Sequence, residues 1–208
     1  MLKTMTKVNL ILSKPKIDYS TYCNQVFALA DNEKTSGSDQ SNDRIEATKL
    51  NTQRIKRIEK HTELLPEIKA GLSKINNKWL WIIITESWCG DGAQNISIIN
   101  KMVDAMPNVT LQLIFRDENI DVINEYLTNG NKSIPKLVCI DNQYFKEIGT
   151  WGPRPVAIQE KVNVLKKEQP SISHYELVKN IHLWYAKDKG ESLQKELFTL
   201  IKQWSNES

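Results

Sequence analysis

The stretch WLWIIITESWCGDG, residues 79–92, decides the fold that this sequence predicts. Residues 79–85 form a continuous apolar run rich in β-branched and aromatic side chains. Such a run is too short for a typical helix and indicates a strand buried on both faces of a sheet. Residues 86–92 are typical of a turn, and residues 93–106 then repeat apolar side chains at helical spacing. The sequence therefore predicts a buried strand that leads past one cysteine into a helix.

Downstream of this stretch, strand and helix patterns alternate. Further strands are expected over residues 109–115, 135–141 and 144–149, with a helix over residues 119–129. Helical crossovers make the first two strands parallel, and the tight turn at Asp141 makes the last two antiparallel. The predicted fold class is therefore α/β, with a mixed four-stranded sheet flanked by helices.

Helical patterns also occupy both ends of the chain. We expect residues 1–75 to form a helical N-terminal extension packed on the core, residues 76–167 to form the sheet domain, and residues 168–208 to form a C-terminal helical extension. A polar, turn-rich loop over residues 35–43 is expected to be mobile.

Composition narrows the classes of function. Hydrophobic residues make up 40% of the 208 residues and charged residues 25%, as in an ordinary globular domain. A net charge of +3 is too small to indicate nucleic-acid or membrane binding, and the sequence contains no apolar run long enough for a membrane span or a secretory signal. The three cysteines are few and odd in number, which favours a reducing cytoplasm. No metal-ligand spacing is present, and no cofactor is expected.

Loops with polar or conformationally special residues converge at one edge of the predicted sheet. Cys89 follows the first strand and Arg116 the second, while Pro135 opens the third strand and residues 149–155 follow the fourth. Because sites in α/β sheets form at such an edge, we expect the functional site there.

Cys89 is the candidate reactive group at this edge. A thiol at a helix N-terminus is close to unpaired backbone N–H groups and the positive end of the helix dipole, which favour the thiolate. Asp91 opposes this by like-charge repulsion and also offers a capping acceptor. The pattern leaves open which effect dominates.

The motif Trp88-Cys89-Gly90-Asp91-Gly92, followed later by Ile134-Pro135, resembles thioredoxin over about residues 75–160. The wider set of sequence motifs in this region is similar to that of a bacterial branch of thioredoxin-like proteins. The resemblance implies a thioredoxin-like domain over residues 76–167, with Cys89 as the catalytic residue. It also implies a cis bond before Pro135, which would present the backbone of Ile134 to a bound peptide.

Two departures from that family bear on function. Gly92 stands where thioredoxin carries its second cysteine, and Ile83 where it carries a buried acid; Glu86 is closer to the motif but is expected in the turn. One hypothesis is therefore monothiol thiol-disulfide exchange with a protein disulfide or a low-molecular-weight thiol, a second thiol resolving the adduct. The alternative is a redox-inactive thioredoxin-fold module that binds a peptide or protein. Whether the protein is an enzyme, and its oligomeric state, stay open.

The remaining candidates each have two interpretations. Arg116 and Arg154 could receive an anionic substrate or form surface ion pairs, and Trp151 could be a substrate platform or a hydrophobic plug. Cys139 is expected in the core as a small apolar residue, and Cys23 is the less excluded partner for Cys89.

Overall fold

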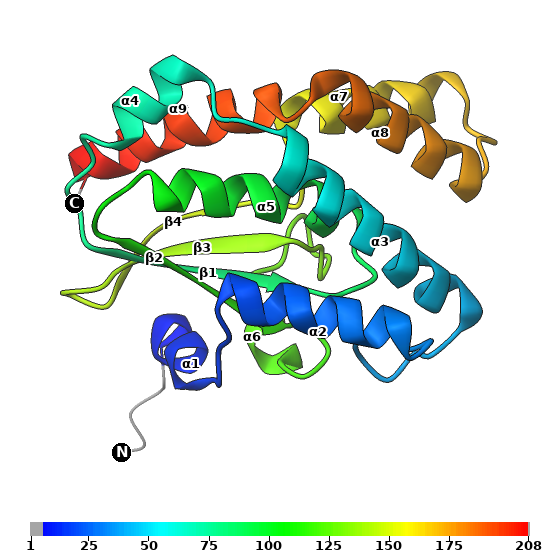
Figure 1. Cartoon of the computed structure of the whole chain (residues 1–208), viewed down its shortest axis with the longest axis horizontal. Helices are drawn as coiled ribbons and strands as arrows, with labels where there is room; N and C mark the ends of the chain where they lie inside the picture. The colour runs from blue at the N-terminus through cyan, green and yellow to red at the C-terminus, as the bar shows by residue number, and fades with distance from the viewer. Residues whose placement is uncertain (1–5, 208) are drawn as a thin grey trace.

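The computed structural model describes residues 6–207, in which four strands form one mixed sheet (Figure 1). The strands are β1 (Trp79–Thr85), β2 (Val109–Phe115), β3 (Lys136–Asp141) and β4 (Lys146–Trp151), in the order β2-β1-β3-β4. β1 pairs parallel with β2 and antiparallel with β3, and β4 pairs antiparallel with β3. Every residue of β1 is buried, as its unbroken apolar run predicts. The α/β fold with a mixed four-stranded sheet is thus confirmed.

Alternation along β1 divides the core into two layers. Trp79, Trp81 and Ile83 face one cluster, and the residues between them face the other. The first face is covered by α2 (Tyr19–Asp31), α3 (Asn42–His61), α4 (Pro66–Leu72), α5 (Gly90–Asp104) and α9 (Glu191–Glu207). The second is covered by α1 (Lys7–Ser13) and α6 (Ile120–Asn124), which Figure 1 shows below the sheet.

Two further helices form a smaller cluster beside the sheet. α7 (Val156–Glu168) and α8 (His174–Asp188) pack through Ile158, Val162, Ile181 and Tyr185. α8 begins with a capping box between Ser173 and Glu176, which fixes where the helix starts. The Tyr185 hydroxyl of this helix forms hydrogen bonds with Asp91 and Asn95 near the start of α5.

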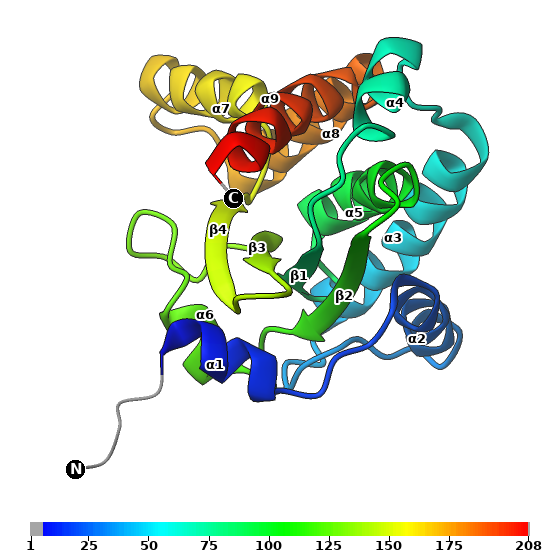
Figure 2. The same ribbon diagram turned by 90° about the vertical axis from the view of Figure 1, so that its left-hand side faces the viewer.

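The C-terminal helix α9 completes the core on the first face. Trp204 packs edge-on against Trp79 and Trp81, with ring centroids 6.5 Å and 6.2 Å away. Gly149 on β4 makes this approach possible, because a Cβ there would overlap the Trp204 indole. Figure 2 shows the C-terminal end of α9 above β4.

The structure differs from the sequence predictions at several element bounds. β4 spans Lys146–Trp151 instead of residues 144–149, and α6 ends at Asn124 instead of continuing to residue 129. The chain turns there because Thr128 and Asn131 form a bridge and Gly130 has a φ of +77°. The loop over residues 35–43, expected to be mobile, is instead anchored to the β1–α5 turn by the buried Thr35 and Ser36. None of the helices within residues 6–207 has the length and apolarity needed to cross a membrane.

Candidate functional site

Cys89 lies at the floor of a cleft of about 1020 Å³ at the predicted edge of the sheet. Helix α3 forms one wall and α8 the other, and the loops around Arg116, Ile134 and Arg154 close the ends. The Cys89 side chain is only 6% exposed. Helix α8 is therefore part of the site, although it lies outside the central region that resembles thioredoxin.

The thiol of Cys89 caps helix α5. Sγ accepts the N–H of Gly92 at 3.2 Å, and the thiol donates to the carbonyl oxygen of Ile134 at 3.3 Å. The Ile134–Pro135 peptide bond is cis. Helix α5 accordingly starts at Gly90, three residues before the predicted start, because the cysteine supplies the cap.

Burial decides the protonation state of this thiol. Burial first and the neighbouring charge of Asp91 second raise the pKa of Cys89 to about 12. The N–H of Gly92 and the guanidinium of Arg154 act in the opposite direction and are outweighed. The sequence left open whether the helix end or Asp91 has the larger effect on the pKa of the thiol. The largest effect is desolvation by burial, which the sequence did not reveal.

Asp91 joins the motif to the C-terminal helices. Its carboxylate accepts from Arg154 at 2.5 Å and from the Tyr185 hydroxyl on α8 at 2.7 Å, and Asn95 donates to the same hydroxyl at 3.0 Å. Burial raises the pKa of Asp91 despite these partners. Arg154 is therefore engaged in an ion pair with the motif itself.

Trp88 lies between two guanidinium groups. Arg44 of α3 is 3.3 Å from the ring centroid, and Arg116 is 4.8 Å from it. Arg116 also forms an ion pair with Asp117 at 2.7 Å, which agrees with the second interpretation of this residue, a surface ion pair. The half-buried tryptophan thus fixes two arginines along the cleft.

The structure brings most of the predicted site residues together. The cleft is lined by Trp88, Cys89, Gly90, Asp91, Arg116, Ile134 and Arg154, while Gly92 and Pro135 lie behind it. Trp151 does not line the cleft: it is 5% exposed, belongs to the core beneath α9, and donates through Nε1 to Glu196 at 2.6 Å. Trp151 is therefore a hydrophobic plug, and its interpretation as a substrate platform is wrong.

No second thiol is placed to resolve an adduct at Cys89. A Cβ at Gly92 would lie 2.7 Å from Thr85 Oγ1, so a side chain there requires a shift of β1 or α5. Cys139 is fully buried and points to the opposite face of the sheet from the cluster that contains Cys89. Cys23 is buried in that same opposite cluster, and all three cysteines are free.

A buried polar network behind the motif was missed by the sequence analysis. Glu86 is fully buried and accepts from the Ser36 hydroxyl and from the backbone N–H of Asp117, the latter at 2.7 Å. Ser36 and Ser87 exchange backbone-to-hydroxyl hydrogen bonds at 2.8 Å in both directions. Burial raises the pKa of Glu86. The clustered hydroxyls of residues 35–41 were the available signal, but their partners lie some 50 residues away.

Two cleft residues were also missed, Arg54 on α3 and His182 on α8. Both lie against Gly90, where an added Cβ would be 3.3 Å from Arg54 Nη1 and 3.0 Å from His182 Cε1. Arg54 donates to Asn51 at 2.8 Å, and Asn51 in turn donates to the carbonyl of Ser87 at 2.8 Å. Burial and two arginines lower the pKa of His182 to about 4, so this histidine is neutral at pH 7.

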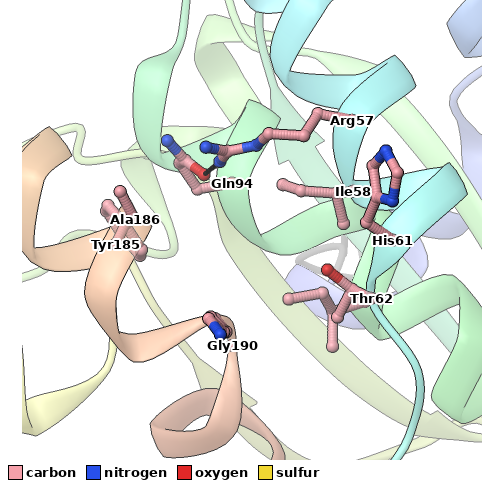
Figure 3. A pocket seen from close by; sticks show the side chains of 10 residues that line it. Arg57, Ile58, His61, Thr62, Gln94, Tyr185, Ala186 and Gly190 are labelled. Carbon is pink, nitrogen blue, oxygen red and sulfur yellow. Dashed lines mark hydrogen bonds between the residues drawn. The ribbon is translucent and has the colours of Figure 1, made fainter.

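A second, smaller cavity of about 310 Å³ lies between the C-terminal ends of α3 and α8 (Figure 3). Arg57 of α3 extends across it and donates to Gln94 of α5 at 3.1 Å, and Tyr185 and Ala186 of α8 lie opposite. Tyr185 thus borders this cavity and also bonds Asp91 in the main site. The cavity contains none of the predicted site residues.

With this geometry established, comparison with known proteins assigns the family. A family model described as thioredoxin matches residues 37–168, which include all four strands and the Cys89 motif. The chain belongs to the thioredoxin family. The match ends at the last residue of α7, so α8, which lines the cleft with Cys89, lies outside the matched region of this thioredoxin-family protein.

Two solved structures resemble this thioredoxin-family protein. One is a protein of unknown function from Pseudomonas aeruginosa, with a TM-score of 0.58 and 16% identity over 90% of this chain and 98% of that one. The other is an HIV epitope-scaffold, with a TM-score of 0.54 and 15% identity over 90% of this chain and 99% of that one. At these identities the shared property is the fold, terminal helices included. No curated protein matches the sequence.

Proposed function

We propose that this protein is a thioredoxin-fold binding module that holds a ligand in the cleft above Cys89 without turning over disulfides. The proposal rests on the buried, protonated state of the Cys89 thiol. Cys89 is 6% exposed, donates to Ile134, and has its pKa raised to about 12 by burial. Because the thiolate is the nucleophile, a thiol that stays protonated at pH 7 is expected to be unreactive.

The surroundings of the thiol support the same proposal. Gly92 leaves no room for a second cysteine next to Thr85, and Cys139 points away on the other face of the sheet. The cleft itself, at about 1020 Å³, has the size of a small-molecule site and is rimmed by the exposed side chains of Leu50, Tyr175 and Leu183. A sheltered thiol beneath a large cleft fits retention of a ligand better than exchange with a folded protein.

The test is the reactivity of Cys89 in a Cys23→Ser, Cys139→Ser background. Its alkylation rate should rise about tenfold per pH unit from pH 7 to 10 without a plateau. Incubation with glutathione disulfide at pH 7.5, followed by intact mass, should give no adduct within an hour. A plateau below pH 8.5 together with rapid adduct formation would refute the binding-only function.

Monothiol exchange is the second candidate, favoured because Cys89 borders the cleft and its Sγ accepts the Gly92 N–H. Cys89 would attack one sulfur of a disulfide, form a mixed disulfide, and release the other sulfur as a thiol that carries the Cys89 proton. A second thiol would then attack the mixed disulfide, take away the bound group as a new disulfide, and return the proton to Cys89. The protein would then be an enzyme acting on low-molecular-weight or protein disulfides. For either candidate we propose the reducing cytoplasm as the compartment, supported by three free, buried cysteines.

A further inference from the structure

The floor of the cleft contains a guanidinium that forms no ion pair. Arg54 has no Asp or Glu of residues 6–207 within salt-bridge distance, although the nearby charge of Asp91 favours its cationic form, and its side chain donates to the neutral Asn51 at 2.8 Å. By contrast, the other three cleft arginines, Arg44, Arg116 and Arg154, each pair with an aspartate. A partly buried guanidinium loses hydration, and in folded proteins this loss is normally offset by an anion.

Unsatisfied polar atoms lie beside Arg54. Nδ1 of His182 and Nε of Arg154 are buried and have no hydrogen-bond partner among the described residues. Both side chains line the same cleft as Arg54 and adjoin the first turn of α5. Buried donors that lack protein partners are expected to bond to water or ligand.

The side chains that line the cleft carry a net positive charge, the same sign as that of Arg54. Its lining includes six Lys and Arg side chains, the four arginines with Lys132 and Lys179, against three aspartates, Asp39, Asp43 and Asp91. Asp39 and Asp91 already pair with Arg44 and Arg154, so among the lining carboxylates only Asp43 is left to balance Arg54 and the two lysines. A neutral His182 adds no repulsion between these cations.

We infer that the cleft floor binds the oxyanion of a small acidic ligand, a carboxylate or a phosphate, between Arg54 and His182. Arg54 supplies the charge and two or more N–H donors, and His182 donates from a ring nitrogen. The position above Gly90 adds the positive end of α5. The inference rests on the proposed binding function and names its ligand class; the enclosing walls of α3 and α8 favour a small molecule over a peptide.

The test is calorimetric titration of the full chain at low ionic strength with glutarate, its neutral diamide and inorganic phosphate. The diamide should not bind, and the ratio of glutarate to phosphate affinity distinguishes the two anions. Arg54→Gln should weaken the binding of the preferred anion at least tenfold, because it removes the unpaired charge. Arg57→Gln is the matched control: the same charge is lost one turn along α3, outside the cleft, and affinity should stay within twofold.

A second readout places the anion next to His182. Binding should raise the pKa of His182, followed by NMR titration of its ring protons, because an anion stabilises the protonated ring. If Arg54→Gln unfolds, Arg54→Lys should fold and bind with intermediate affinity. The inference is overturned if neither anion binds, if Arg54→Gln binds as tightly as the wild type, or if Arg57→Gln loses as much affinity. An unreactive Cys89 with no anion affinity would sink this inference and leave the binding module standing.

Discussion

The thiol of Cys89 and the carbonyl oxygen of Ile134 are joined by a 3.3 Å hydrogen bond across 45 residues of sequence. The bond ties the cap of α5 to the residue before the cis proline. It also occupies the carbonyl that an extended peptide would use to pair with the backbone of Ile134. A peptide docked in β-fashion would have to share this acceptor with the thiol, which is one reason why we favour a small ligand.

The cap predicts how substitutions of Cys89 change stability. Cys89→Ala removes the acceptor for Gly92 and the donor to Ile134, and should lower the free energy of unfolding by about 1–2 kcal/mol. Cys89→Ser keeps both hydrogen-bonding functions and should cost less. Urea unfolding followed by circular dichroism measures both. Equal losses for alanine and serine would show that the thiol is not acting as a cap.

Removing the charge of Asp91 should activate the thiol. Asp91 raises the pKa of Cys89, so Asp91→Asn should lower this pKa and speed alkylation about tenfold at pH 8.5. The variant keeps an oxygen acceptor for Tyr185. Asp43→Asn, an exposed acid on the same cleft, is the control and should leave the rate unchanged. A rate that stays constant in Asp91→Asn would mean that burial alone suppresses the thiolate.

Restoring a second cysteine should strain the structure. Gly92→Cys places a Cβ 2.7 Å from Thr85 Oγ1 and should destabilise the protein by about 1–3 kcal/mol through overpacking. In a Thr85→Ala background the cost should fall, whereas Thr85→Ser keeps the oxygen and should keep the cost. The free energies of unfolding of the wild type, the three single variants and the two double variants close both cycles. Additive effects would contradict steric conflict at this position.

The loop over residues 35–43 should contribute to stability through one hydroxyl. Ser36→Ala removes one of the two donors to Glu86 and leaves the Ser87 N–H without its acceptor in a buried site, which should cost about 1–3 kcal/mol. Ser38→Ala changes an exposed serine two residues along and should cost less than 0.5 kcal/mol or so. Thermal or urea unfolding compares them. If the two variants are equally stable, the loop is not anchored in solution.

His182 should make folding sensitive to mild acid. Burial, Arg54 and Arg154 lower its pKa to about 4 from the ordinary 6.5. The unfolded chain therefore binds a proton that the folded chain does not between these values, and stability should fall as pH decreases from 6.5 to 4. His182→Gln should reduce this slope by up to one proton, whereas His61→Gln, at an exposed site, should not. Urea midpoints measured across this pH range test the prediction. If the dependence of stability on pH is unchanged in His182→Gln, His182 is not the group that titrates.

The sheet could be predicted because its signals are local. The run of residues 79–85 and the alternation of strands with helices identified all four strands, since burial on both faces and turn residues are visible within each segment. The edge with Cys89, Arg116 and Ile134 followed from the topology. The predicted length of α6 was wrong. The helix ends at Asn124, and a turn with a bridge between Thr128 and Asn131 follows where the helix was expected to continue.

The environment of the thiol could not be predicted because it is assembled from distant segments. The helix end at Cys89 was readable, but the thiol is buried in a cluster with Ile134 and residues of β1–β3, α1 and α6, which only the fold brings together. Nothing in the sequence around Arg54 indicates a site, and its place in the cleft emerges only when α3 meets α5. Trp151 is a plug because α9 covers it, which the sequence near residue 151 does not indicate.

The position of Trp204 has a consequence for biosynthesis. Trp79 and Trp81 on the central strand receive their edge-on partner only from α9, more than 120 residues later. During vectorial synthesis the sheet emerges early with part of its first face uncovered, and that face closes only after residue 204 has left the ribosome. Nascent chains halted within α9 would therefore expose an aromatic surface, making them natural clients for holding chaperones until translation ends.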